Sequence, residues 1–230
     1  MTKQTDLLRQ VSIFKGLDDH AIAVLSASLR PLAFGKDGLI VSQDDQGDAL
    51  YIIESGRVKV VLYGESGREM ILTMFRAGDF FGEMSLLDGQ PRSANVIAME
   101  EAHLLVLSRD DFLRSLSEVP TVAANILAEM SMRLRKADAI IGNLALLDVY
   151  GRVARLLIDL AKTEGDATDE GVVITSRPTQ QDIASMIGTS RETVSRVLSE
   201  FQRRGFLQMQ GKKILLAHGF AEREVFDQED

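Results

Sequence analysis

Residues 32–107 alternate short apolar runs with turns that contain glycine, and this pattern strongly limits the folds available to the chain. The candidate strands are residues 39–41, 50–53, 58–63, 70–74 and 102–107. Many short strands separated by turns are typical of an antiparallel barrel or sandwich. We therefore expect a β domain in the first half of the chain.

Helical patterns flank this β region. Residues 6–29 predict a helical segment with a break near Lys15 and an end at Pro31, and residues 109–117 predict another short helix. Pro120 opens a much longer helix. In it, apolar residues recur at alternating steps of three and four, namely Leu127, Met130, Leu134, Ala137, Ile141 and Leu144. This seam predicts a dimer interface, with a core-facing amphipathic helix as the alternative.

The last third of the chain has the pattern of a winged helix-turn-helix. After a helix at residues 148–162 and a predicted loop, TEGDATDEG, a short helix begins at residues 179–182 and ends at a turn made by Gly188. Ser190 is a good N-cap for a second, basic helix. Residues 206–210 and 213–216 predict a β-hairpin beside it.

The charge distribution favours the same segment as a DNA-binding surface. The chain carries a net charge of −8, yet residues 177–213 hold seven bases and three acids, a local +4. Residues 214–230 hold one base and five acids, or −4, which predicts a solvated acidic tail or a modulator of the basic wing. One basic segment in an acidic protein is a candidate electrostatic footprint for DNA.

Composition excludes several classes of function. The chain has no cysteine, which removes disulfides, thiolate nucleophiles and cysteine-ligated clusters. His20, His103 and His218 show no metal-ligand spacing, and no catalytic motif is present, so we expect neither a metal, a cofactor nor an enzyme. No apolar run reaches the ~18 residues of a membrane span, and the first residues lack a signal-peptide core, so we expect a cytoplasmic protein.

The segment GEMSLLDGQPRSA, residues 82–94, places four groups where they can converge on a small anion. Gly82 allows a close approach of backbone to ligand, and Glu83 can accept from a sugar hydroxyl. Arg92 supplies a planar cationic fork for a phosphate, with the Ser93 hydroxyl beside it. Taken alone, such a segment is also compatible with a polar turn and a surface arginine. We refer to residues 82–94 as the cassette.

Three motifs, in this order, resemble the CRP/FNR family of transcription regulators, closest to its cyclic-AMP receptor protein branch. They are the cassette, GNLALLDVYGRVARLL at 142–157 and TSRETVSRVL at 189–198. The resemblance implies an α+β fold with a jelly-roll sensor domain at residues 1–118. It also implies a dimerisation helix and hinge at 119–148, and a winged helix-turn-helix with an acidic tail at 149–230.

The resemblance also implies roles for individual residues. Gly82, Ser93 and Ala94 would lie at the cyclic phosphate, Arg92 would pair with its charge, and Glu83 would take the ribose hydroxyl. In the second domain Arg191, Glu192 and Arg196 match the family's base-reading positions, which implies a TGTGA-like half-site. Thr179, Gln181 and Ser190 would position the DNA backbone. Gln180 replaces a family arginine and weakens one phosphate contact.

The long helix departs from the family at the base of the ligand. The family presents a threonine and a serine to adenine, whereas this chain has Ala137 and Asp138. Alanine offers no side-chain hydrogen bond. An ionised aspartate only accepts, so it can accept from the adenine amino group, while the N1–H and N2–H₂ groups of guanine offer it a bidentate pair. Arg133, one turn earlier, matches a family arginine and can neutralise Glu83 or Asp138. Asp138 can also be a solvated side chain on the helix flank.

The sequence thus predicts a homodimeric regulator of transcription with cyclic AMP as its allosteric effector. Its predicted partners are double-stranded DNA, a cyclic nucleotide, a second copy of the chain and RNA polymerase. The alternatives are the same fold responding to cyclic GMP or cyclic di-GMP, and an effector-independent regulator with a vestigial pocket. A redox or gas sensor is disfavoured by the missing cysteines. Residues 164–171 lie where relatives touch RNA polymerase. Their composition differs from that of the relatives, so we do not expect them to have the relatives' activating role.

Overall fold

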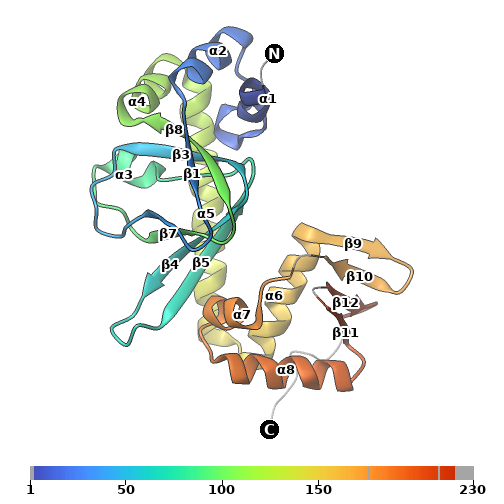
Figure 1. Ribbon diagram of the computed structural model, residues 1–230. Coiled ribbons are helices and arrows are strands. Elements are labelled where there is room, and N and C mark those ends of the chain that lie inside the picture. Colours follow the sequence, from blue (N-terminus) through green and yellow to red (C-terminus); the bar gives the residue numbers. More distant parts are fainter. Residues whose placement is uncertain (1–2, 176, 212, 221–230) are drawn as a thin grey trace. The chain divides into compact units, whose positions relative to one another are not determined.

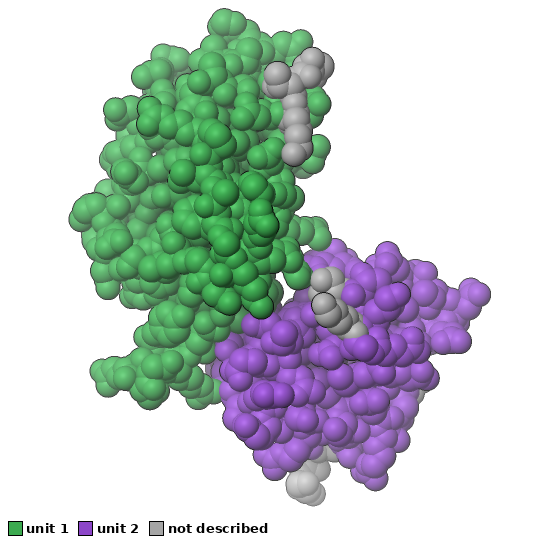
Figure 2. Space-filling model, viewed as in Figure 1, with its two compact units in different colours: residues 1–136 green, residues 137–230 purple. Residues whose placement is uncertain are grey.

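The computed structural model describes residues 3–175, 177–211 and 213–220. The chain divides into two compact units, residues 1–136 and 137–230 (Figure 2). The division falls inside the long helix α5 (Pro120–Leu146), which the sequence predicts from Pro120 onward. The predicted domain limits at residues 118 and 148 remain predictions.

The first unit contains two four-stranded antiparallel sheets (Figure 1). One sheet has the order β1 (Arg30–Phe34), β8 (Ala102–Ser108), β3 (Ala49–Ser55) and β6 (Phe80–Phe81). The other has the order β2 (Leu39–Val41), β7 (Asn95–Ala98), β4 (Arg57–Tyr63) and β5 (Glu69–Arg76). Side chains such as Ile53, Val58 and Phe81 form a buried cluster from both sheets. The predicted jelly-roll β domain is confirmed.

In the first unit the sequence also marks Phe80–Phe81, strand β6, as strand-like, whereas two strands of this unit were not predicted. Strand β1 contains Pro31, which the sequence indicates only as the end of a helix, and Pro31 pairs with Leu105 of β8. The pairing is possible because β1 is at the edge of its sheet, where a residue without an N–H is tolerated. Strand β7 directly follows the cassette and pairs with both β2 and β4.

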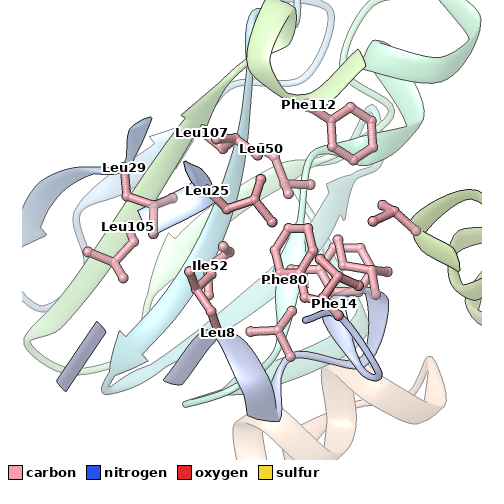
Figure 3. Close-up of a cluster of buried hydrophobic side chains, with 14 of the residues drawn as sticks. Leu8, Phe14, Leu25, Leu29, Leu50, Ile52, Phe80, Leu105, Leu107 and Phe112 are labelled. Atoms are coloured by element: carbon pink, nitrogen blue, oxygen red, sulfur yellow. The ribbon is translucent and has the colours of Figure 1, made fainter. Parts of the chain in front are cut away.

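Helices cover one face of the first sheet. They are α1 (Lys3–Gln10), the 3₁₀ turn η1 (Ser12–Phe14), α2 (Asp19–Ser28), α4 (Arg109–Glu118) and the start of α5. Their apolar faces meet the sheet in a fully buried cluster that includes Leu8, Phe14, Phe80 and Phe112 (Figure 3). Burying one such aromatic side chain stabilises the fold by about 1.5–3 kcal/mol. The cluster therefore fixes β6, which leads into the cassette, against the N-terminal helices and α5.

The second unit builds a helix-turn-helix on a four-stranded sheet. Its helices after α5 are α6 (Val149–Glu164), α7 (Gln180–Ile187) and α8 (Arg191–Arg203). The sheet has the order β11 (Leu207–Gln210), β12 (Lys213–Ala217), β10 (Gly171–Ile174) and β9 (Gly165–Thr168). The wing hairpin is confirmed by the pairing of β11 with β12. Residues 221–230, most of the predicted acidic tail, lie outside the described residues, as does Lys212.

The predicted loop TEGDATDEG is wrong, because most of it forms the hairpin of β9 and β10. Ala167 pairs with Val172 and Asp166 with Val173. Acidic residues rarely form strands, which hid the hairpin in the sequence. Here the β-branched residues of β10 favour the pairing, and Asp166, the one acidic residue of β9, is exposed at the edge of the sheet.

Within the residues that the structure describes, no helix is both long and apolar enough to cross a membrane.

Candidate functional site

The cassette begins with a backbone geometry that only glycine adopts readily. Gly82 ends β6 in the left-handed region, with φ 90° and ψ 5°, and precedes a short helix, α3 (Glu83–Asp88). A Cβ on Gly82 would lie 2.7 Å from Arg92 Nη1 and 3.0 Å from the carbonyl oxygen of Ala49. The close approach of these groups therefore requires glycine. The sequence did not predict α3.

Arg92 is buried within the cassette rather than projecting from its surface. Its side chain is 5% exposed, and its Nη1 and Nη2 donate to the carbonyl oxygens of Gly82 at 2.7 Å and Ala49 at 2.8 Å. The guanidinium also lies over the Tyr51 ring, 5.7 Å from its centroid. These contacts fix the orientation of the cation, whose Nη2 also lies 4.0 Å from Oδ1 of the exposed Asp48 side chain. A guanidinium has five N–H donors, so the two carbonyl oxygens do not exhaust its capacity to bind an anion.

Two further residues of the cassette that we expect at the ligand, Ser93 and Ala94, directly follow Arg92 in the sequence. Ser93 is exposed, and its hydroxyl lies 3.9 Å from the sulfur of Met84. Ala94 is 5% exposed and packs inward. An exposed hydroxyl next to a fixed arginine is a suitable pair of donors for a phosphate.

Glu83 is a buried carboxylate with one oxygen bonded and one free. The residue is 2% exposed, and Oε1 accepts from Arg133 Nη1 at 2.9 Å. Oε2 has no hydrogen-bond partner among the described residues. Burial raises the pKa of the Glu83 carboxyl above its ordinary value, and the Arg133 charge opposes this rise. The site thus presents one buried acceptor without a donor.

Arg133 connects α5 to the cassette. Its Nη2 donates to the carbonyl oxygen of Phe80 at 2.8 Å, and its Nε donates to Glu129 Oε1 at 3.1 Å. The guanidinium lies 5.0 Å from the Phe75 ring centroid and 4.6 Å from that of Phe80. The prediction that Arg133 neutralises Glu83 agrees with this geometry. Glu129 was missed, although its i,i+4 spacing to Arg133 was visible in the sequence.

Ala137 and Asp138 follow on α5 in the second unit, and both are exposed. The predicted seam is also largely exposed. Leu127 is 68% exposed, Leu134 63% and Ile141 64%, at intervals of seven residues. Leu144 is 36% exposed, and Met130 is half-buried. A row of exposed large apolar residues at heptad spacing is a surface that a partner helix can cover.

In the second unit the first helix of the pair is anchored by its cap. Thr179 Oγ1 accepts from Asp182 N at 3.1 Å and donates to Asp182 Oδ2 at 2.6 Å, while Thr179 N donates to the same carboxylate oxygen at 3.0 Å. This capping box engages the hydroxyl predicted to position DNA. Gln181, one residue into the helix, is exposed.

Helix α8 separates an apolar face from a charged one. Val194, Val197, Leu198 and Phe201 are buried, while Arg191, Glu192 and Arg196 are exposed. Ser190 caps the helix by accepting from Thr193 N at 3.2 Å, as predicted. The structure therefore brings the three predicted base-reading residues onto one open face at the start of this helix.

The end of α8 carries a different charge arrangement. Glu200 Oε1 accepts from Arg203 Nη2 at 2.7 Å and from Arg204 Nε at 2.5 Å. These hydrogen bonds lower the pKa of the Glu200 carboxyl to about 2. Two bases of the basic segment are thus paired within the helix. Over the described ranges, no group of three or more His, Cys, Asp or Glu side chains is arranged to hold a metal ion.

Comparisons with known proteins match both units. Residues 31–118 match the cyclic nucleotide-binding domain family, and residues 151–218 match the Crp-like helix-turn-helix domain family. The CRP-like cAMP-activated global transcriptional regulator of Mycobacterium tuberculosis is 34% identical over 212 residues, 92% of this chain and 95% of that protein. The cAMP-activated global transcriptional regulator CRP of Escherichia coli is 35% identical over 178 residues, 77% of this chain and 84% of that protein.

Solved structures agree with these relatives. The c-di-GMP responsive global regulator CLP of Xanthomonas campestris has a TM-score of 0.75 at 26% identity, covering 87% of this chain and 99% of its own. The catabolite activator protein of Thermus thermophilus is 32% identical with a TM-score of 0.54, covering 93% and 97% of the two chains.

Proposed function

The chain belongs to the CRP/FNR family of transcription regulators, and from this membership we propose that it acts as a homodimer that binds cyclic AMP and, in response, a TGTGA-like palindrome. Its matched domains make it a DNA-binding regulator with a cyclic nucleotide-binding domain. The family consists of regulators rather than enzymes.

One observation carries the ligand assignment. The buried Oε2 of Glu83 has no donor among the described residues, although its neighbour Oε1 is held by Arg133. An unpaired buried acceptor costs about 1–3 kcal/mol, so a ligand that supplies a hydroxyl donor recovers this free energy. In this proposal a ribose hydroxyl donates to Glu83 at the start of the cassette, and the cyclic phosphate accepts from Arg92 and Ser93 at its end. Gly82 and Ala94 leave room for that phosphate beside the backbone.

The exposed seam on α5 supports the homodimer. Leu127, Leu134 and Ile141 are each more than 60% exposed along one helix. A second copy of α5 covers them in the coiled-coil manner, with the small Ala137 allowing the two helices to approach closely. In such a dimer the two α8 helices enter successive major grooves of a palindrome.

The exposed face of α8 supports sequence-specific reading of DNA. Arg191 and Arg196 present guanidinium forks that match guanine O6 and N7, and Glu192 accepts from cytosine N4. Thr179, Gln181 and Ser190 lie at the start of α7 and α8, where they position the DNA backbone. We include RNA polymerase as a partner because the M. tuberculosis and E. coli relatives are named as global transcriptional regulators.

A guanine nucleotide is the second candidate effector, and Asp138 is the observation that favours it. Asp138 is exposed on α5 where the family has a serine, and an ionised carboxylate can accept both N1–H and N2–H of guanine. The X. campestris relative is described as responsive to c-di-GMP. Cyclic GMP and cyclic di-GMP are therefore the alternatives to cyclic AMP.

Calorimetry with the three nucleotides tests the assignment, with Asp138→Ser beside the wild type. We expect the wild type to bind cyclic AMP and Asp138→Ser to bind it more tightly by up to about tenfold, the equivalent of one hydrogen bond, since serine can both donate to and accept from adenine whereas an ionised aspartate only accepts. Binding of cyclic di-GMP or cyclic GMP alone, lost in Asp138→Ser, would favour the second candidate. If none of the three nucleotides gave a heat of binding, the result would favour an effector-independent regulator.

A further inference from the structure

Three polar residues of α5 form a row that leads from the N-terminal segment to the ligand site. Asn125, Glu129 and Arg133 are four residues apart, so they share one face of the helix. Asn125 Nδ2 donates to the carbonyl oxygens of Ile13 at 3.2 Å and Lys15 at 2.9 Å. The first residue of the row thus holds η1 on α5.

Glu129 occupies the middle of this row and uses both of its oxygens. Oε2 accepts from the Ser12 hydroxyl at 2.9 Å, and Oε1 accepts from Arg133 Nε at 3.1 Å. Arg133 in turn donates to Glu83 Oε1 at 2.9 Å. A continuous chain of hydrogen bonds therefore runs from Ser12 through Glu129 and Arg133 to Glu83.

We propose that Glu129 is a positioning residue of the ligand site, which orients the Arg133 guanidinium against Glu83 and couples that orientation to the N-terminal segment through Ser12. The inference rests on the proposed function, because it assumes that Glu83 binds the ligand.

Geometry explains why a second carboxylate is needed. A guanidinium is planar, and bonds on both Nε and Nη1 fix its rotation about the side-chain stem. With Nε bonded to Glu129, Nη1 bonds Glu83, Nη2 bonds the Phe80 carbonyl oxygen, and the guanidinium lies over the rings of Phe75 and Phe80. Without Glu129 the Nε bond is lost and the bonds of Nη1 and Nη2 remain, so the orientation of the guanidinium against Glu83 Oε1 is less constrained. Oε2 would then be held less firmly toward the ligand.

Charge adds a second effect on Glu83. The charged groups around it are Arg133 and Glu129 on α5, with Arg92 donating to the Gly82 carbonyl oxygen and Arg109 of α4 donating to that of Ser85. The negative charge of Glu129 raises the pKa of Glu83, while Arg133 lowers it. A glutamine at position 129 can still accept from Arg133 Nε through its oxygen and can donate to the Ser12 hydroxyl through its amide. It would therefore shift ligand binding along the pH axis with little loss of affinity at neutral pH.

The test measures cyclic AMP affinity of the full chain by calorimetry between pH 5 and pH 8, alongside thermal melting. Glu129→Ala should weaken binding at neutral pH by roughly three- to tenfold, the fold-change of one hydrogen bond. Glu129→Gln should restore most of that affinity and move the low-pH decline of binding to lower pH. Ser12→Ala should weaken binding by about twofold, and Ser12→Ala with Glu129→Ala should be no weaker than Glu129→Ala alone. Glu118→Ala, an exposed glutamate on α4, is the matched control.

Several results would overturn the inference. Folded Glu129→Ala with wild-type affinity would show that Glu83 and the Phe80 carbonyl oxygen are enough to orient Arg133. If Glu129→Gln bound the ligand as weakly as Glu129→Ala, Glu129 would not act by orienting Arg133. If the pH profile of Glu129→Gln matched that of the wild type, the charge of Glu129 would have no effect on Glu83. Additive losses in the double variant would break the link to Ser12. Wild-type protein that binds no cyclic nucleotide would overturn the proposed function together with this inference.

Discussion

The cassette and helix α8 both depend on arginine and glutamate, but they hold these residues in opposite environments. Arg92 and Glu83 are 5% and 2% exposed, and their orientation is fixed by backbone carbonyls and by Arg133. Arg191, Glu192 and Arg196 are exposed on a helix whose opposite face is buried. The cassette charges are therefore part of the core, whereas the α8 charges lie outside it.

This difference separates stability from recognition. Buried charged groups are costly unless they are bonded, so removing one partner destabilises the unit that contains it. Exposed charges contribute little to folding, and their removal affects mainly the partner that they meet. Substitutions in the two regions should therefore give different combinations of lost stability and lost binding.

The largest expected effect comes from Arg92→Met. Methionine keeps the stem but leaves the carbonyl oxygens of Gly82 and Ala49 without their donors, at a cost of about 2–4 kcal/mol. Cyclic AMP affinity should fall by roughly a hundredfold because the phosphate loses its cation. Urea unfolding and calorimetry measure the two losses.

Arg114→Met is the control for this substitution. Arg114 is an arginine of the same unit with a 56% exposed side chain and an ion pair to Asp111. Its loss should change stability by less than about 0.5 kcal/mol and leave ligand affinity unchanged. Equal stability of Arg92→Met and the wild type would contradict the view that the cassette arginine belongs to the core.

Arg196→Ala should show the opposite combination. Binding to a TGTGA-like palindrome should weaken by about 1–3 kcal/mol in free energy, because the contact of the Arg196 guanidinium with guanine O6 and N7 is removed. Discrimination between bases at that one base pair should also decrease. Thermal stability should be unchanged. Fluorescence anisotropy with matched and single-substituted duplexes measures this, with Arg203→Ala as control, since Arg203 lies two turns further along α8 and is paired with Glu200. A loss as large in Arg203→Ala would show that general charge, rather than base reading, dominates.

Much of the fold could be predicted because the sequence signals are local. Periodicity and glycine turns indicated five strands of the sandwich, Pro120 marked the start of α5, and Ser190 marked the start of α8. Strands β1 and β9 could not be predicted, because their pairing is supplied by partner strands rather than by their own residues. Strands β7 and β10 contain β-branched residues, but each is only four residues long and was also missed. Tertiary pairing overrode weak propensity at β1 and β9.

The site was predictable to a similar degree. Residue chemistry identified Glu83 and Arg92, and the family resemblance added Arg133, which the structure connects to Glu83 directly. The burial of Arg92 could not be read from sequence, because Ala49 lies 43 positions away on another strand. The role of Glu129 was also hidden, since an i,i+4 pair on a helix is ordinarily a surface feature.

The pH dependence of stability in acid tests the difference between the buried charges of the cassette and the exposed charges of α8, and Glu83 is the first residue to test. Its pKa is raised above the ordinary value of 4.5, so the folded first unit binds a proton more readily than the unfolded chain. Wild-type stability should therefore fall as pH rises from 4.5 toward the raised pKa. Glu83→Gln lacks this titration and should lose that slope in urea unfolding, while Glu118→Gln should keep it. An unchanged slope in Glu83→Gln would contradict the burial argument.

Glu200 should show the smallest effect, with the opposite sign. Its pKa is lowered to about 2 by the hydrogen bonds from Arg203 and Arg204, so its contribution to stability is present above 4.5 and is lost as pH falls toward 2. Glu200→Gln should therefore lower the melting temperature of the second unit slightly at neutral pH, and the difference from wild type should shrink in acid. Because Glu200 pairs on the helix surface, added salt should also reduce the difference. Glu170→Gln, an exposed glutamate of the same unit, is the control. If the difference in melting temperature between the wild type and Glu200→Gln grew on acidification, Glu200 would behave like the buried Glu83 of the cassette. The two regions would then not differ at this residue.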